Sequence, residues 1–290
     1  MATVNDDYPK NNQTDLSDEQ LKALALQNYK QAEVKKSKFP TEMIPLPSEV
    51  VLYPKQHPLS SGKIEMKYMT AREEDILTSQ NLIKQGVVLD KLFQSMIITP
   101  INYNDIIVGD KNAIMIAARI LGYGKDYDVE ITCPACDHSN KVTVDLTSIQ
   151  PKPVNQDGPS KMIGPNCFEF ELPQTKRKVV FQLLSHGLDS EIDKQLREIK
   201  KTAKKDSVDH ELTTRLKRLI ISVDGETSQT FINNFVDNEL FALDSKALRA
   251  QIKDVAPDMP LVIGFECEHC GHSETEEEFP ITSQFFWPST

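Results

Sequence analysis

Two Cys-x-x-Cys pairs place the strongest constraint on how this chain folds. The first runs from Cys133 to Cys136 and the second from Cys267 to Cys270, with 131 positions separating Cys136 from Cys267. Each pair follows a short extended run and precedes a polar turn and a second extended run. This is the pattern of a zinc knuckle, and two facing knuckles supply the four sulfurs of a tetrahedral site. We therefore predict one structural Zn2+ per chain, bound by Cys133, Cys136, Cys267 and Cys270.

The residues that follow each pair fit this prediction. Asp137 comes directly after the first pair and Gly271 after the second. Gly, and less often Asp, tolerates the left-handed backbone that such turns need. His138 and His272 each lie two residues after a pair, so a mixed Cys and His ligand set stays open beside the all-cysteine one. The fifth cysteine, Cys167, has no partner motif and is expected to be a small apolar residue.

Other uses of paired cysteines fit this sequence less well. A disulfide is disfavoured because the chain has the features of an intracellular protein, in which thiols stay reduced. A thioredoxin-like motif needs a helix start after a buried strand. Residues 137–144 instead have the pattern of a turn followed by a strand. Two separate metal sites would each lack two ligands.

Composition and charge narrow the class of protein. The chain has 290 residues and a formal net charge of −10, which argues against binding to a phosphate backbone. Its start is polar and acidic, so no signal peptide is expected. The longest apolar window, residues 113–121, contains Arg119 and is too short to span a bilayer. We expect no membrane insertion.

The pattern of extended and helical segments predicts an α+β fold. A mainly helical N-terminal domain precedes a zinc ribbon that is split by a large α+β insertion. The predicted parts are a flexible N-terminal tail (1–46), an N-terminal α+β domain (47–126), the first half of the ribbon (127–149), an inserted α+β subdomain (150–260), and the second half of the ribbon with a C-terminal aromatic tail (261–290).

Several local signals predict individual elements. Thr70 and Glu73 have the spacing of a capping box at a helix start. Asp110 and Asp244 are each predicted to cap a helix. Residues 150–165 contain four prolines and are predicted to be a linker. Residues 167–172 and 178–184 alternate as the two strands of a hairpin.

No set of residues in the sequence predicts catalysis. The chain has no GxSxG, HExxH, phosphate-loop or dinucleotide motif. His186 is isolated at a predicted strand-to-helix junction and is expected to be structural or exposed rather than catalytic. Four thiolates would fill the coordination shell of zinc and leave no position for an activated water. We therefore predict that the protein is not an enzyme and has no small-molecule substrate.

An ordered series of short motifs runs through the first half of the chain. The series is Leu46-Pro47-Ser48, Leu52-Tyr53-Pro54, Gly62-Lys63-Ile64, Met69-Thr70-Ala71-Arg72-Glu73-Glu74, Ile107-Val108-Gly109-Asp110-Lys111, Arg119-Ile120-Leu121-Gly122-Tyr123-Gly124 and Cys133-Pro134-Ala135-Cys136. It resembles the baseplate hub and assembly proteins of T-even-like contractile-tailed bacteriophages. The likeness covers roughly residues 45–150 and continues more weakly through the second cysteine pair to residues 285–288.

The resemblance implies a structural or assembly role in the baseplate hub, without enzymatic activity. Its implied partners are other tail baseplate and hub proteins. It implies a place in the virion, in the tail baseplate, after assembly in the host cytoplasm. The competing interpretation is a zinc-ribbon nucleic-acid-binding or transcription-associated factor, which the negative charge disfavours. A zinc hydrolase is disfavoured by the full set of cysteine ligands.

Three consecutive aromatic residues stand close to the C-terminus. Phe285, Phe286 and Trp287 would expose a large apolar surface, so something must cover them. They either fold back onto this chain and complete its core, or insert into a neighbouring subunit, where Trp is a frequent hot-spot residue. We predict that they form a partner-binding element, with core completion as the alternative.

Overall fold

The computed structural model describes residues 40–202, 210–281 and 283–287. By internal contacts the chain divides into residues 1–40 and 41–290. The predicted N-terminal tail lies outside the described residues except at its end, where residues 41–45 form a paired strand. In the described ranges we find no helix with the length and apolar content needed to span a membrane.

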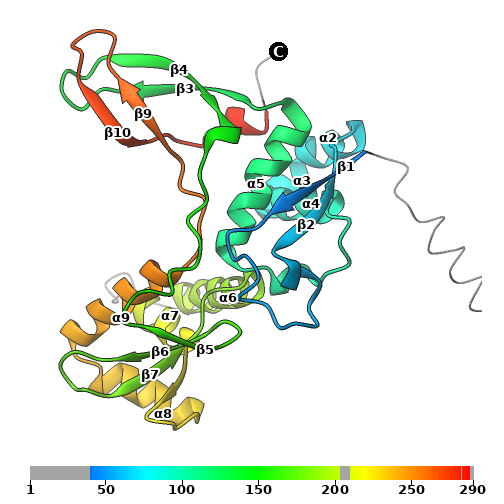
Figure 1. Cartoon of the computed structure of the whole chain (residues 1–290). Helices are drawn as coiled ribbons and strands as arrows, with labels where there is room; N and C mark the ends of the chain where they lie inside the picture. The colour runs from blue at the N-terminus through cyan, green and yellow to red at the C-terminus, as the bar shows by residue number, and fades with distance from the viewer. Residues whose placement is uncertain (1–39, 203–209, 282, 288–290) are drawn as a thin grey trace, which may run out of the picture. The chain divides into compact units, whose positions relative to one another are not determined.

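Residues 41–123 combine a two-stranded antiparallel sheet with a series of helices (Figure 1). The helix that begins at Ala71 is interrupted at Ser79, and Gly86 caps the end of the helix that follows. The elements are β1 (Thr41–Pro45), η1 (Pro58–Ser61), β2 (Lys63–Lys67), α2 (Ala71–Thr78), α3 (Gln80–Gln85), α4 (Val88–Met96), η2 (Tyr103–Asp105) and α5 (Val108–Tyr123).

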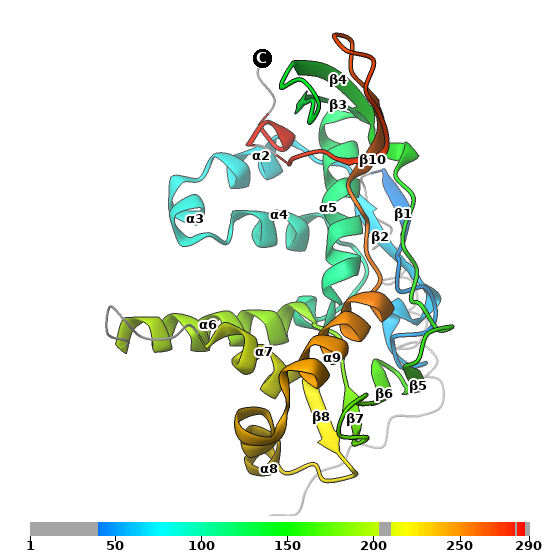
Figure 2. The same ribbon diagram turned by 90° about the vertical axis from the view of Figure 1, so that its left-hand side faces the viewer.

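Two antiparallel hairpins carry the cysteine pairs. The hairpin β3–β4 (Asp126–Thr132 and Ser139–Asp145) holds the first pair at its tip. The hairpin β9–β10 (Val262–Glu266 and Ser273–Glu278) holds the second. Both views place the two hairpins side by side (Figures 1 and 2). The short helices η3 (Leu146–Ser148) and η5 (Ser283–Phe285) follow them.

The segment between the two hairpins forms a four-stranded sheet with helices. The strands pair in the order β5–β6–β7–β8, and all neighbours are antiparallel. The predicted hairpin is β6–β7, and β5 arises within residues 150–165, which the sequence predicted to be a linker. Figure 2 shows α7, α8 and α9 gathered around this sheet. The elements are β5 (Lys161–Gly164), β6 (Cys167–Glu171), β7 (Lys178–Phe181), α6 (His186–Thr202), α7 (Glu211–Leu219), β8 (Ile220–Val223), α8 (Gln229–Asn234), the π-helix η4 (Phe235–Glu239) and α9 (Ala242–Val255).

Helix α5 lies directly against the chain that returns from this segment. A Cβ atom at Gly109 would come within 1.9 Å of the carbonyl oxygen of Pro257. The side chain of Asn112, one turn further along α5, donates to Asp258 at 2.7 Å. A glycine is therefore required for this close approach.

Two acidic residues predicted to be helix caps serve a different purpose. Asp110 lies inside the first turn of α5, whose N-cap is Ile107. Its carboxylate is fully buried and accepts the Ser48 N–H at 2.9 Å and the Tyr53 hydroxyl at 2.6 Å. Burial raises the pKa of this carboxyl. The capping prediction for Asp110 is wrong because its oxygens satisfy groups more than fifty positions away rather than its own helix.

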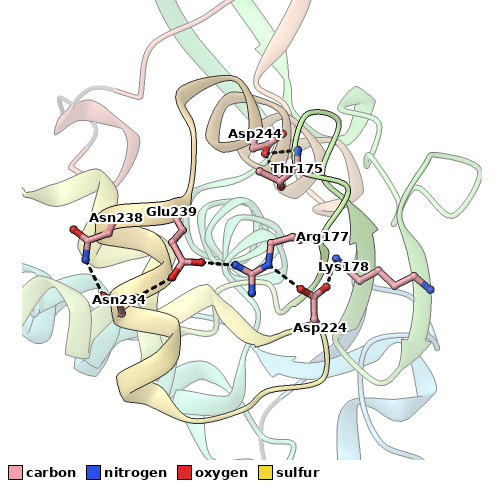
Figure 3. A network of polar contacts seen from close by, with 8 residues as sticks. All are labelled: Thr175, Arg177, Lys178, Asp224, Asn234, Asn238, Glu239 and Asp244. Atoms are coloured by element: carbon pink, nitrogen blue, oxygen red, sulfur yellow. Dashed lines mark hydrogen bonds and ion pairs between the residues drawn. The ribbon is translucent and has the colours of Figure 1, made fainter.

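Asp244 is likewise in the first turn of α9 rather than at its cap, which is Phe241. It accepts the backbone N–H groups of Gln174 and Thr175 at 2.7 and 3.1 Å and so fixes the turn between β6 and β7 to α9. Figure 3 shows the contact between Asp244 and Thr175, and beside it a second one, in which Arg177 donates to Asp224 and Glu239 at 2.8 and 2.6 Å.

The capping box at the start of α2 is confirmed. The Glu73 carboxylate accepts a hydrogen bond from the backbone N–H of Thr70 at 3.0 Å. It also accepts hydrogen bonds from the Lys67 ammonium group at 2.7 Å and from the Ser95 hydroxyl at 2.6 Å. Burial raises the pKa of Glu73, but the hydrogen bonds from Lys67, Ser95 and Thr70 outweigh it and lower the pKa to about 2. This carboxylate therefore ties α2 to β2 and α4.

We expect the stabilising effect of Glu73 to be lost in acid. Because its pKa is depressed in the folded state, its contribution is full above the unfolded pKa near 4.5 and falls as the pH drops from about 5 towards 2. Glu73→Gln should lower the free energy of unfolding by about 2 kcal/mol at pH 7 and by much less at low pH. Urea unfolding at several pH values measures the difference. Glu74→Gln, at the exposed neighbouring position, is the control, and an equal loss at all pH values for Glu73→Gln would contradict this account.

Candidate metal centre

The two cysteine-bearing turns have the same backbone hydrogen bonds. In the first, the Cys133 N–H donates to the carbonyl of His138 at 2.9 Å, and the Asp137 N–H donates to the carbonyl of Cys133 at 2.9 Å. In the second, the Cys267 N–H donates to the carbonyl of His272 at 2.8 Å, and the Gly271 N–H donates to that of Cys267 at 2.9 Å. The matched flanks seen in the sequence therefore correspond to matched turns.

The residues predicted to adopt a left-handed backbone do so. Asp137 has φ of 55° and Gly271 has φ of 71°. The two sulfurs of each pair lie within 4.8 Å of one another. The turn conformation predicted from the sequence is confirmed.

The structure brings the two pairs together at one point. The sulfurs of Cys133 and Cys270 are 3.7 Å apart, as are those of Cys136 and Cys267. All four sulfurs lie within 4.8 Å of one another. Four sulfurs placed about 2.3 Å from one ion in a tetrahedron would be separated by about 3.8 Å. The cluster thus has the dimensions of a four-cysteine site and could hold a zinc ion.

The thiols also influence one another's ionisation. Burial raises the pKa of Cys267, but backbone N–H groups of Cys270 and His269 and the thiols of Cys133 and Cys136 outweigh it and lower the pKa to about 6. The backbone N–H of His138 lowers the pKa of Cys136, but burial and the three neighbouring thiols outweigh it and raise the pKa to about 12. Four negatively charged sulfurs at this spacing would repel one another, so a full set of thiolates requires a cation between them.

Asn140 joins the two turns and was not identified from the sequence. It is almost fully buried in β4, with 2% of its surface exposed. Its amide group donates to the carbonyl of His138 at 3.0 Å, and its oxygen accepts the backbone N–H of Glu268 at 3.0 Å. The same amide nitrogen lies 3.7 Å from the sulfur of Cys267. In the sequence, the one indication of this role is a polar Asn at an inward-facing strand position close to the first cysteine pair.

The histidines around the cluster lie outside the ligand group. Within the described ranges, the ligand atoms close enough to share an ion are the four cysteine sulfurs. His138 stacks on His269 with ring centroids 5.1 Å apart. His272 lies beside Glu274, with 3.2 Å between its Nε2 and the carboxylate. Cys167 is half-buried in β6 and lies outside the cluster.

The C-terminal aromatic residues pack against the first hairpin and against a helix of the N-terminal part of the chain. Phe285 and Phe286 are buried, with 0% and 2% of their surfaces exposed. Phe285 packs edge-on against Tyr127 of β3 at 5.0 Å, and Phe286 lies 6.1 Å from Phe93 of α4. For these two residues the structure supports core completion, the alternative to partner binding.

Trp287 differs from its two neighbours because 36% of its surface is exposed. Its indole N–H donates to the carbonyl of Leu77 at the end of α2, at 3.1 Å. One edge of the ring is therefore anchored, and about a third of the residue's surface is open to solvent.

We expect Asn140→Ala to loosen the junction between the two turns. The substitution leaves the Glu268 N–H and the His138 carbonyl without this partner, which costs about 1–2 kcal/mol because both hydrogen bonds are partly buried. The thermal midpoint should fall by roughly 3–8 °C for a chain of this size. Differential scanning calorimetry measures it, with Ser139→Ala at the exposed preceding position as the control. An unchanged midpoint for Asn140→Ala would show that the amide bridge contributes nothing.

Comparison with known proteins gives one match. The family model described as T4 bacteriophage base plate protein matches residues 52–287. Searches of curated proteins and of solved structures gave no match. The matched range includes both cysteine pairs, Asn140, the segment between the hairpins and the C-terminal aromatic residues. Because the match covers most of the chain, this protein belongs to the T4 bacteriophage base plate protein family.

Proposed function

We propose that this protein is a structural component of the baseplate hub of a contractile phage tail, stabilised by one structural zinc ion. The family match over residues 52–287 supports the baseplate role. The tetrahedral dimensions of the four-sulfur cluster support the zinc ion, with Cys133, Cys136, Cys267 and Cys270 as its ligands. The protein is assembled in the host cytoplasm and is carried in the virion, where its partners are other baseplate and hub proteins.

The proposed metal has a structural role rather than a catalytic one. Four thiolates complete the tetrahedral shell of zinc, so no position is left for a water nucleophile. The binding energy instead goes into holding the two turns together.

The metal would also close a very long loop. Cys136 and Cys267 are 131 positions apart, and the sheet β5–β8 with helices α6 to α9 lies between them. A cross-link over such a length stabilises the fold by a few kcal/mol, mainly by restricting the unfolded chain. The ion thus holds both ends of the inserted segment at the ribbon.

A zinc-ribbon factor that binds nucleic acid is the competing function. The formal charge of −10 opposes association with a phosphate backbone, and the family match favours the tail. Retention on a nucleic-acid column, compared with co-sedimentation with purified tails, separates the two functions.

Zinc content tests the metal directly. Protein purified without chelators should contain one zinc ion per chain, as measured by inductively coupled plasma mass spectrometry. The double substitution Cys267→Ser with Cys270→Ser should remove most of the metal, lower the thermal midpoint and make residues 150–260 more sensitive to protease. Cys167→Ser is the matched control, since this cysteine lies outside the cluster.

Either of two results would overturn the zinc proposal. One is wild-type protein that binds no zinc even after growth with added zinc. The other is a double variant that keeps a full equivalent and melts like the Cys167→Ser control.

Trp287 is the part of the aromatic tail that we propose to contact a partner. Trp287→Ala should destabilise the fold less than Phe286→Ala, because 36% of the Trp287 surface is exposed, but it should reduce co-sedimentation with baseplates. Phe286→Ala should instead lower the free energy of unfolding by about 3–5 kcal/mol, since its ring is buried. Phe241→Ala, at a residue with 51% of its surface exposed, controls for the loss of a surface aromatic residue. Normal entry of Trp287→Ala into baseplates would exclude this contact.

A further inference from the structure

The acidic charge of the chain is concentrated in one small part of it. We call residues 126–149 and 261–281 the acidic ribbon. It contains eleven acidic residues and one basic residue, Lys141. Its formal charge is therefore −10, equal to that of the whole chain, and the rest of the chain has as many basic as acidic residues. Its acidic residues are Asp126, Asp128, Glu130, Asp137, Asp145, Glu266, Glu268, Glu274, Glu276, Glu277 and Glu278.

A groove of about 570 Å3 runs between the two hairpins of the acidic ribbon. Strand β4 borders it through Val142, Thr143 and Val144, and strand β9 borders it through Ile263 and Gly264. A Cβ atom at Gly264 would meet no other atom within 4 Å. The groove therefore has a lining of both apolar and polar residues, acidic surroundings and open space beside a residue without a side chain.

The edge of β4 that borders the groove has unpaired backbone groups. In an antiparallel pair, residues alternate between those hydrogen-bonded to the partner strand and those directed away from it. At one end of the β3–β4 hairpin the Cys133 N–H donates to the His138 carbonyl, and at the other end the Leu146 N–H donates to the Lys125 carbonyl. The register between these two bonds is unbroken, so they determine which residues of β4 are hydrogen-bonded to β3. Thr143 then falls at an outward position.

The same alternation of hydrogen-bonded and outward-directed residues can be followed along β9. The bonds Cys267 to His272 and Phe279 to Leu261 fix the two ends of β9–β10. Counted from either end, Val262 and Gly264 fall at outward positions, although a bulge lies between Glu274 and Glu277. Each hairpin is a two-stranded sheet in the described structure, so the outward N–H and C=O groups of Thr143, Val262 and Gly264 have no strand partner there.

These observations define the chemistry of the occupant. Unpaired backbone donors and acceptors at a strand edge select an extended chain, as in β-strand addition. An acidic surface favours Lys and Arg, and the groove lining of Val142, Val144 and Ile263 favours apolar side chains. An extended segment that alternates basic and apolar residues meets all three conditions, because successive side chains of a strand point to opposite faces.

We propose that the groove of the acidic ribbon receives such a basic, extended segment of another baseplate subunit, which adds as a strand to the edge of β4. The identity of the partner as a baseplate subunit rests on the proposed function, whereas the strand addition itself does not. Charges on strand edges also prevent unwanted pairing between copies of a protein. The experiment must therefore separate strand addition from simple attraction between charges.

The probe is a short peptide of alternating Lys and Val, capped at both ends, added to the full chain. In amide NMR spectra we expect shifts centred on Thr143, Val262 and Gly264 and slower hydrogen exchange at the Thr143 N–H. The same peptide with Glu in place of Lys should not bind. Added salt should weaken the binding of the Lys peptide, but the same amide signals should still shift.

Two substitutions at one position isolate the backbone contact. Thr143→Pro removes an N–H that points away from β3, so the hairpin keeps its own hydrogen bonds. Thr143→Val keeps that N–H, and both variants lose the hydrogen bond from the Thr143 hydroxyl to Asp128. We expect Thr143→Pro to bind the peptide about fivefold more weakly than Thr143→Val. Gly264→Phe, which fills open space in the groove, should abolish binding while the zinc content stays unchanged.

Equal affinity of Thr143→Pro and Thr143→Val, or shifts centred on Glu266, Glu268 and Glu274, which do not line the groove, would overturn the proposal and leave only attraction between charges. Failure of the baseplate role would appear separately, as wild-type protein that binds the peptide at the groove but does not co-sediment with tails.

Discussion

The meeting of four sulfur atoms from two distant turns is the constraint on which the rest of the structure depends. Each turn is short and is determined by its own backbone hydrogen bonds, but neither pair of cysteines is sufficient alone. Joining them fixes the start and the end of a segment of more than a hundred residues at one place. The buried amide of Asn140 adds a second link between the turns, so that the polypeptide contributes to the joint independently of any metal.

The C-terminal aromatic residues connect this joint to the N-terminal helices. Tyr127 of β3 packs against both Phe279 and Phe285 and donates its hydroxyl to the carbonyl of Pro280 at 3.2 Å. Arg119 of α5 lies over the Phe285 ring and donates to the carbonyls of Gly124 and Asp126 at 2.7 and 2.9 Å. Phe285 and Phe286 are therefore part of the core, whereas 36% of the surface of Trp287 stays exposed.

Features that depend on a few adjacent residues could be predicted from the sequence. The cysteine turns, the left-handed Asp137 and Gly271, and the capping box at Thr70 all follow from local spacing. Asp110 and Asp244 looked like helix caps because their local context is that of a cap, yet their carboxylates bind backbone groups far away in the chain. Long-range hydrogen bonds leave no local signal. For the same reason the sequence did not predict the role of Asn140 or the pairing of β5, and the burial of Phe285 and Phe286 could be given only as an alternative.

X-ray absorption at the zinc edge tests the central claim most directly, because it reports the atoms bound to the metal. If one ion joins the two turns, the spectrum of the purified full-length protein will show four sulfur neighbours at about 2.3 Å and no nitrogen or oxygen bound to the ion. A spectrum with two sulfurs and two lighter atoms around the zinc would mean that the pairs do not share an ion, and would contradict the account.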